Sequence, residues 1–575
     1  MKTTILSTTL SAIMLLFATA CTNEHNEDSD LTPENKQVQF KLNFTDYGED
    51  QEFEGTRASF SKNEVKKQMV DLGNGILAEV TVQRDTTKTT ETASAATRAM
   101  ENGHYTILAY QGGTCKGEIK GQVYYGTFTP DPGTKDRFRL PHGIYTFVCF
   151  NDKVTRSGDQ LTITRDNAEK AMIGITKNYN INTDTPMEVS FTMKHVGARM
   201  RIKLTAYMNI STATKASIAD AAGDVPTIAT YDLTTDSYTY SNGSTSTGNY
   251  TFNTSGGQSV GTYYPLANKT SLGYQYFLPT TDGAKLKLTF TDGSIYGRNM
   301  AGASLILNPS PSLNMVQNGS YLVNVKLLYH FLYLFSDGTT GLITESTYGG
   351  GTKIPVGVVL SQSKRMAIAL KNANNDDDCE WCYSTNWSLA EQKSVSRTNN
   401  FAALCNMENG YEETWNASAS TDGVTVKGDT PDFQAFYAAG HYDPGTPVSG
   451  SLVGKKWYLP AMGEWKYVYS ALGLINRPTI TSDYQATEQW PSGSLVNAAF
   501  NLVGGTDLHG YNSGIGGTNA PAPNMWYWSS SEYSYYSDQA GYIWMGWSAI
   551  TFHYNNRGGK RGSPNRGWVR PFIRY

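Results

Sequence analysis

Short segments in which apolar and polar residues alternate recur along the first 330 residues of this chain. The first of them, residues 38–44, reads Val-Gln-Phe-Lys-Leu-Asn-Phe, and a period of two places alternate side chains on opposite faces of a strand. Turns rich in glycine and asparagine separate these segments, and long amphipathic helices are scarce. We therefore expect two β-sandwiches in tandem, over residues 37–195 and 196–330. The other alternating segments are 76–82, 105–110, 144–150, 189–204, 285–290 and 321–327.

Tryptophan is distributed unevenly and indicates a second kind of unit. All 11 tryptophans lie between Trp381 and Trp568, and the first 380 residues contain none. We place the junction near residue 330, where one apolar strand-like segment ends and another begins, so the second unit spans 331–575. A helix is predicted over residues 460–474, because large apolar residues recur there at i, i+3, i+4 and i+7: Trp465, Val468, Tyr469 and Leu472.

The first 21 residues have the pattern of a bacterial lipoprotein signal. Lys2 precedes a short apolar core, small residues occupy positions 18 and 20, and Cys21 follows them. We expect residues 1–20 to be removed as a signal peptide, Cys21 to carry the lipid and residues 21–36 to form a flexible polar tether. The apolar run is too short to span a bilayer, so the prediction is an outer-membrane lipoprotein at the cell surface. An ordinary secretory peptide is the alternative.

Charge and cysteine content limit the partners and the redox chemistry. The net charge of −4 provides no basic surface, so no nucleic-acid partner is expected. The lone Cys379-x-x-Cys382 motif is expected to form a local disulfide or two packed thiols rather than half of a zinc site. If Cys21 is acylated, an odd number of cysteines remains, which argues against a disulfide framework and leaves the pairing open: Cys115, Cys149, Cys379, Cys382 and Cys405.

Several motifs of the first part resemble the fimbrillins, the subunits of type V pili. They are the lipoprotein signal, the early strand, Tyr-Thr-Ile-Leu-Ala-Tyr at 105–110 and Phe-Thr-Met-Lys-His-Val-Gly-Ala-Arg-Met-Arg-Ile at 191–202. The resemblance covers residues 21–330 and implies two transthyretin-like β-sandwiches. It also implies that an arginine-specific protease removes the first strand after export. The groove left behind would accept a strand from another pilus subunit by β-strand addition.

Carried onto this sequence, the resemblance identifies a removable strand and a cleavage site. The inward-facing side chains of the strand would be Val38, Phe40, Leu42 and Phe44. Cleavage would follow Arg57, although Arg98 is accessible by the same loop argument and stays an alternative. The opposing interpretation is that the first strand is an ordinary one that stays attached. His195 is expected to be a packed strand residue rather than a ligand.

The second unit resembles the C-type-lectin-like domains of bacterial surface proteins. Residues 457–465, Trp-Tyr-Leu-Pro-Ala-Met-Gly-Glu-Trp, match the W-x-L-P-x-x-x-E-W segment of that family. Residues 354–360, 526–532 and 568–572 match further segments of the family in the same order. The resemblance implies an α+β fold in which loops display the binding surface. The expected fold class is therefore mainly β, with tandem sandwiches followed by an α+β lectin-like domain.

Aromatic side chains of this unit are the candidates for ligand binding, because they stack on sugars and anchor protein interfaces. The tryptophans of the family's own signature are expected to pack in the core: Trp457, Trp465, Trp528 and Trp568. The candidate ligand contacts are Tyr533, Tyr535, Tyr536, Trp526 and Trp544. The ligand would be a glycan or protein of a host or bacterial surface. Ala522-Pro523-Asn524 lacks the carboxylate of a calcium-dependent sugar site, so no metal is expected.

Motifs of catalysis are scarce. The chain contains no His-Glu-x-x-His zinc helix, no Gly-x-Ser-x-Gly nucleophile elbow and no phosphate-binding glycine loop. Arg557-Gly558-Gly559 resembles the formylglycine-generating enzymes, but Cys405 is the last cysteine and the matching catalytic pair is missing. We therefore expect neither an enzyme nor a cofactor.

These patterns favour a pilus tip subunit with an adhesive terminal domain. A stalk subunit must offer a carboxy-terminal strand to its neighbour, whereas this chain ends inside a compact unit at residues 570–575. Two alternatives are kept. One is a lipid-anchored surface receptor for glycan or protein that never polymerises, and the less favoured one is an oxidase on the lectin-like fold.

Overall fold

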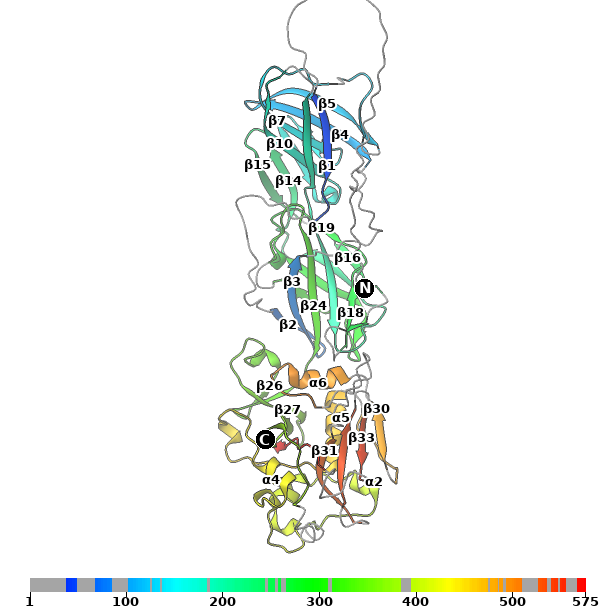
Figure 1. Cartoon of the computed structure of the whole chain (residues 1–575), viewed down its shortest axis with the longest axis vertical. Helices are drawn as coiled ribbons and strands as arrows, with labels where there is room; N and C mark the ends of the chain where they lie inside the picture. Colours follow the sequence, from blue (N-terminus) through cyan, green and yellow to red (C-terminus); the bar gives the residue numbers. More distant parts are fainter. Residues whose placement is uncertain are drawn as a thin grey trace, which may run out of the picture.

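The computed structural model describes most of the chain beyond residue 37. The described residues are 38–48, 68–84, 102–124, 127–134, 137–183, 187–243, 247–253, 257–259, 265–308, 313–383, 394–473, 476–483, 485–489, 493–508, 526–534, 539–546, 549–554 and 566–575. They form an elongated molecule in which two β-sandwiches and a carboxy-terminal unit follow one another along the longest axis (Figure 1). The chain is mainly β, as the sequence predicts.

The first sandwich, at the upper end of Figure 1, contains a curled seven-stranded sheet. Its order is β1 (Val38–Phe44), β11 (Met187–His195), β10 (Met172–Ile181), β7 (Gly143–Asn151), β4 (Gly103–Gln111), β5 (Thr114–Tyr124) and β6 (Thr127–Pro130). Although β1 and β4 are four positions apart in this order, the rings of Phe44 and Tyr105 lie 6.0 Å apart. The sheet therefore curls around a core of its own.

A smaller sheet covers the other face of this curled sheet. Its order is β15 (Ser237–Asn242), β14 (Pro226–Asp232), β9 (Gln160–Thr164) and β8 (Thr155–Ser157). Leu161 and Ile163 of β9 pack with Leu108 of β4 and Val148 of β7 in a second core. Both faces of the large sheet are thus buried against apolar side chains.

The second sandwich has the same two-sheet plan. One sheet follows the order β17 (Gly257–Ser259), β18 (Pro265–Thr270), β12 (Ala198–Ala206), β24 (Ser320–Tyr329), β3 (Ile76–Arg84) and β2 (Gln68–Gly73), and β19 (Gln275–Phe277) also pairs with β12. The other sheet has the order β16 (Gly248–Thr251), β13 (Lys215–Asp220), β20 (Leu286–Asp292) and β23 (Ser304–Ile306). Alternate residues of β12 and β24 point into the core between the two sheets.

Strand pairing crosses the division that the sequence predicts at residue 195. Strand β3 pairs along its whole length with β24, from Ile76↔Tyr329 to Arg84↔Tyr321, so residues 68–84 contribute to the second sandwich. Conversely, β14 pairs with β9 and contributes to the first sandwich. Neither sandwich is one uninterrupted stretch of sequence, because local alternation fixes which face of a strand is apolar but not which sandwich the strand joins.

The carboxy-terminal unit mixes strands with short helices. One sheet has the order β26 (Thr340–Gly341), β25 (Tyr333–Phe335), β27 (Pro355–Ser361), β28 (Met366–Ala369), β34 (Phe572–Arg574) and β29 (Trp457–Tyr458). The other has the order β30 (Ala486–Gln489), β33 (Ala549–His553), β32 (Gln539–Met545) and β31 (Trp526–Tyr533). The described helices include α2 (Phe401–Leu404), α3 (Gly410–Trp415), α4 (Gln434–Gly440), α5 (Trp465–Gly473) and α6 (Gly493–Asn501).

Helix α5 confirms the helical pattern found in the sequence. It begins at Trp465, after a 3-10 turn over Met462–Glu464, and packs against β27 and α6. The four residues of the predicted apolar face are buried: Trp465, Val468, Tyr469 and Leu472. Helix α6 was not predicted. No helix among the described residues is both long enough and apolar enough to cross a membrane.

The buried carboxylate of Glu464 explains why a glutamate occurs in the 457–465 motif. Its Oε2 accepts a hydrogen bond from the backbone N–H of Ala461 at 2.8 Å, and its Oε1 accepts one from the Tyr458 hydroxyl at 2.9 Å. Arg574 of β34 lies 3.4 Å from the same Oε1. Burial raises the pKa of Glu464 to about 7. The motif therefore joins the start of α5 to strands β29 and β34.

A disulfide engineered between β3 and β24 tests the pairing that crosses residue 195. Thr81 and Asn324 are directly opposed in this antiparallel pair, and opposed residues have Cα atoms about 4.5–5.5 Å apart, within disulfide range. We expect the Thr81→Cys/Asn324→Cys variant to form this cross-link under mild oxidation, as peptide mapping by mass spectrometry would detect. Thr81→Cys/Thr192→Cys, which joins β3 to β11, is the control and should not cross-link. The opposite pattern would contradict the strand assignment.

Candidate functional site

Strand β1, the predicted removable strand, lies at the edge of the curled sheet (Figure 1). It runs parallel to β11, in a register from Val38↔Met187 to Phe44↔Met193. No described strand pairs with its other edge. The backbone of β1 is thus bonded on one side only, and removal of the strand would leave the edge of β11 unpaired.

The apolar face of β1 closes the core of the first sandwich. Val38 and Leu42 are buried, at 4% and 7% exposure, and Phe40 and Phe44 are half-buried against the same core. The ring of Phe40 lies 5.5 Å from that of Phe138 and 6.1 Å from that of Phe191. The four residues predicted to face inward therefore do so.

The opposite face of β1 is polar, because Gln39, Lys41 and Asn43 alternate with the apolar residues and are exposed. Beyond the strand, Thr45 is bound to β11 by two bonds to the carbonyl of Met193, from its backbone N–H at 3.1 Å and from its hydroxyl at 3.0 Å. Within residues 38–48, the contacts that hold β1 in its groove are hydrogen bonds and side-chain packing. Any extended segment with the same alternation could make the same main-chain bonds and fill the same positions.

The predicted lipidation residue and the two candidate cleavage residues belong to segments on either side of β1 in the sequence. Cys21, Arg57 and Arg98 all lie outside the described residues. His195, at the end of β11, is 8% exposed and stacks on the ring of Tyr47 at 4.0 Å, so it is a packed residue as expected.

The aromatic ligand candidates of the carboxy-terminal unit differ in their surroundings. Trp526 is 3% exposed and Tyr533 is 6% exposed, with the Tyr533 ring stacked on that of Tyr554 at 3.9 Å. Their burial argues against both as ligand contacts, because β31 is a buried strand along its whole length. Trp544 is 39% exposed and stays a candidate. Tyr535 and Tyr536 lie outside the described residues.

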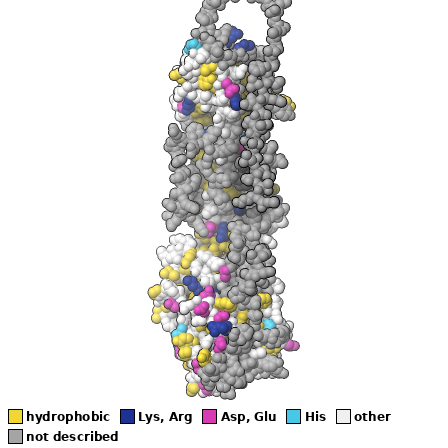
Figure 2. All heavy atoms as spheres, in the orientation of Figure 1, with side chains coloured by type: hydrophobic (Ala, Val, Ile, Leu, Met, Phe, Trp, Pro, Cys, Tyr) yellow, Lys and Arg dark blue, Asp and Glu magenta, His cyan; other side chains and the backbone are white. Residues whose placement is uncertain are grey.

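Two further aromatic residues are exposed that the sequence did not single out. Tyr348 and Tyr383 are 55% and 46% exposed on loops of the carboxy-terminal unit. Three of the four signature tryptophans that were expected in the core are buried: Trp457, Trp465 and Trp528. The fourth, Trp568, is half-buried. On the face shown in Figure 2, acidic and basic side chains of this unit are interspersed.

The cysteines of the Cys-x-x-Cys motif are two packed thiols that form no disulfide. Cys379 and Cys382 are buried beside Trp381, and the other described cysteines also form no disulfide. Burial raises the pKa of Cys379 to about 12, which keeps the thiol protonated at neutral pH and lowers its reactivity. Among the described residues, no group of three His, Cys, Asp or Glu side chains is arranged to hold a metal ion.

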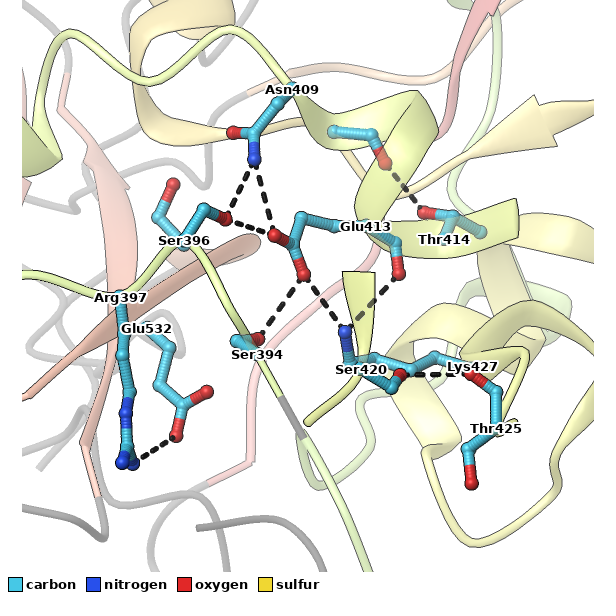
Figure 3. Close-up of polar contacts among 12 residues, drawn as sticks. Ser394, Ser396, Arg397, Asn409, Glu413, Thr414, Ser420, Thr425, Lys427 and Glu532 are labelled. Atoms are coloured by element: carbon cyan, nitrogen blue, oxygen red, sulfur yellow. Dashed lines mark hydrogen bonds and ion pairs between the residues drawn. The ribbon is translucent and has the colours of Figure 1, made fainter. Parts of the chain in front are cut away.

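A buried ion pair in the carboxy-terminal unit has no counterpart among the sequence predictions. The Lys427 ammonium lies 2.8 Å from Oε2 of Glu413, on α3, and their side chains are 0% and 2% exposed. Ser394 also donates to Oε2, at 3.2 Å, while Ser396 and Asn409 donate to Oε1 (Figure 3). Both carboxylate oxygens are thus occupied by donors, so the cluster is suited to joining loops rather than to proton transfer.

A second charged contact lies beside this cluster. Arg397 approaches Oε1 of Glu532 at 3.8 Å, and the Glu532 side chain is fully buried on β31 (Figure 3). No sequence signal marks either contact. Arg397 and Glu532 are far apart in the chain, whereas Glu413 and Lys427 are closer but belong to segments without periodicity. The first contact joins α3 to neighbouring loops, and the second joins Arg397 to strand β31.

Comparisons with known proteins give no family. No protein-family model matches the chain, and no curated protein matches it. Similar solved structures include a candidate cell adhesion protein from Bacteroides uniformis, with 18% identity over 39% of this chain and 86% of that chain and a TM-score of 0.28. A fimbrial protein from Bacteroides ovatus is 11% identical over 94% of this chain and 99% of that chain, with a TM-score of 0.25.

A third structure is the fimbrial anchor protein Mfa2 from Porphyromonas gingivalis, with 9% identity over 34% of this chain and 72% of that chain and a TM-score of 0.20. The structures that this chain resembles are therefore adhesion and fimbrial proteins.

Replacing Leu42 by alanine tests how much the apolar face of β1 contributes. Removing a buried leucine side chain typically costs about 2 to 5 kcal/mol, so amides of β11 should exchange with deuterium faster in the Leu42→Ala variant. Lys41→Ala, on the exposed face of the same strand, is the matched control and should leave exchange unchanged. Equal protection of β11 in both variants would show that β1 does not close this core.

Breaking the buried ion pair should destabilise the carboxy-terminal unit. Lys427→Met leaves Glu413 buried without its cation, which typically costs about 3 to 5 kcal/mol of unfolding free energy. Lys364→Met removes an exposed partner of Glu408 and should cost less than about 1 kcal/mol. Tryptophan fluorescence during denaturant unfolding measures both, because every tryptophan lies in this unit. Equal effects of the two variants would contradict the role of the buried pair.

Proposed function

We propose that this chain is a fimbrial tip subunit that is exported as a lipoprotein and assembled by strand exchange. The observation that carries the proposal is β1, an edge strand that closes the core of the first sandwich with four apolar side chains and a single row of main-chain bonds. Removing it would expose a long apolar groove beside an unpaired strand edge. A strand from a neighbouring subunit is the partner that such a groove fits.

Arg57 is the cleavage position that the strand pairing supports. A cut there would release β1 alone, together with the acylated Cys21 and its tether. A cut after Arg98 would also detach β2 and β3, and β3 lies between β24 and β2 with Ile76, Leu77 and Val80 fully buried. Loss of β3 would open the second sandwich. We therefore propose Arg57, and not Arg98, as the position where cleavage leaves a stable subunit.

The tip position is supported by the surroundings of β34. This strand pairs with β28 on one edge and with β29 on the other, so it is not available to complete the groove of another subunit. Arg574 is further held by Glu412 at 2.9 Å and by the buried Glu464. A subunit that accepts a strand without donating β34 suits the distal end of a pilus.

The carboxy-terminal unit would then supply the adhesive surface. Its exposed aromatic residues Trp544, Tyr348 and Tyr383 are suited to stacking on a surface glycan or to anchoring a protein ligand. We propose no catalytic activity and no cofactor, since both thiols of the Cys-x-x-Cys motif are buried and burial raises the pKa of Cys379. A second candidate function is a lipid-anchored receptor that never polymerises. In such a receptor β1 would stay docked in its groove, as it is in this structure.

The amino terminus of protein recovered from the cell surface distinguishes these two functions. Strand exchange after cleavage at Arg57 predicts a mature chain that begins at Ala58 and carries no acyl mass, whereas a start at Ala99 would contradict the choice of Arg57 over Arg98. Intact mass spectrometry and amino-terminal sequencing measure both features. An acylated Cys21 retained on all of the surface material would contradict the tip-subunit proposal and support the anchored receptor.

A further inference from the structure

The four residues that follow β1 enter the junction between the two sandwiches. Strand β1 belongs to the first sandwich, but the N–H of Gly48 donates to the carbonyl of Asn318, which precedes β24 of the second sandwich, at 2.9 Å. The side-chain amide of Asn318 donates in return to the carbonyl of Asp46 at 3.0 Å. Asn318 also accepts from the N–H of His195 through its Oδ1 at 3.2 Å. One asparagine thus joins this segment to both sandwiches.

Tyr47 fills a socket at this junction. Its ring stacks on His195 of β11, with centroids 4.0 Å apart and planes 12° apart, and lies 6.0 Å from the ring of Tyr276 of β19. Its hydroxyl donates to the carbonyls of Ala168 and Glu169, at 3.2 and 3.0 Å. The residue is only 9% exposed. A tyrosine is therefore recognised here both by its ring and by its hydroxyl.

A cation closes the socket. The guanidinium of Arg199, on β12, lies 4.8 Å from the ring centroid of Tyr47 and 4.2 Å from that of Tyr274. Its Nε donates to the Ser320 hydroxyl at 2.9 Å, which holds it in place. A cation over an aromatic face is attracted by the ring, whereas an aliphatic side chain offers no such interaction. We call the set formed by His195, Arg199, Tyr274, Tyr276 and the 168–169 carbonyls the tyrosine socket.

We propose that the tyrosine socket selects the donor strand that replaces β1. The inference rests on the proposed function, because release of β1 by cleavage at residue 57 would also remove Tyr47 and empty the socket. Phe44 is the last inward-facing residue of β1, and Tyr47 follows it by three positions. The partner is a strand of another subunit with four alternating apolar residues and a tyrosine three positions beyond the last of them.

The socket adds selectivity that the groove itself lacks. Main-chain bonds are independent of sequence, and apolar pockets tolerate many side chains of similar size. By contrast, an incoming strand without an aromatic residue at this position would remove one of the two rings that the Arg199 cation faces. It would also leave the 168–169 carbonyls without the hydroxyl that donates to them in this structure. Unpaired polar groups at a buried position are the usual source of strong discrimination.

Peptide exchange into the cleaved chain tests this inference. A specific protease site replaces residue 57 in the full chain. After cleavage, fluorescent peptides spanning residues 38–48 are added in excess, and their binding to the cleaved chain and their dissociation from it are measured. We expect the native peptide and its Asn43→Ala variant, altered on the exposed face, to bind equally well. The Tyr47→Ala peptide should dissociate at least about tenfold faster. The Tyr47→Phe peptide should be intermediate, since it keeps the stacking and loses two hydrogen bonds.

A variant of the chain provides a second readout. Arg199→Gln should reduce the difference between the native and the Tyr47→Ala peptides, and its thermal unfolding checks that it is folded. Equal dissociation of the native and Tyr47→Ala peptides would overturn the tyrosine socket while leaving strand exchange intact. If the cleaved strand stays bound and no added peptide binds even in excess, strand exchange itself is contradicted. The selective role of the socket is then contradicted as well.

Discussion

The core of the first sandwich depends on the parallel pairing of β1 with β11. This pairing places four apolar side chains over a curled sheet whose far strands would otherwise be open to water. Burial of such side chains is worth about 1.5 to 3 kcal/mol each when complete, so the strand is a large part of the stability of the first sandwich. An edge strand that is essential for the core, yet bonded on one side only, can be replaced only by an equivalent strand.

The two sandwiches and the junction between them form a second level of organisation. Strands β2 and β3 precede most of the first sandwich in the sequence but belong to the second, and β14 and β15 do the converse. The segment after β1 is bonded to Asn318, so the end of β1 is linked to the second sandwich as well. The carboxy-terminal unit is different, because its buried pair of Glu413 and Lys427 joins helix α3 to the segment around residue 427.

Several of these features could be predicted from the sequence, and others could not. Alternation identified β1 and the faces of its side chains, and helical spacing identified the apolar face of α5, because both signals are local. The exchange of strands across residue 195 was not predictable, since pairing partners such as Thr81 and Asn324 are far apart in the chain. The socket around Tyr47 was missed for the same reason, and the pair of Glu413 with Lys427 was missed because its segments show no period. Burial of Trp526 and Tyr533 shows that aromatic content alone does not reveal a surface.

The identity of the strand that occupies the edge of β11 in the native assembly decides whether strand exchange takes place. A structure of the protein within intact surface filaments, determined by electron cryomicroscopy, would show this edge together with the side chains that fill the groove. Strand exchange predicts that the position of β1 is taken by a strand of another polypeptide, with residues 38–48 of this chain missing. The presence of the chain's own Val38–Phe44 in that position would contradict it.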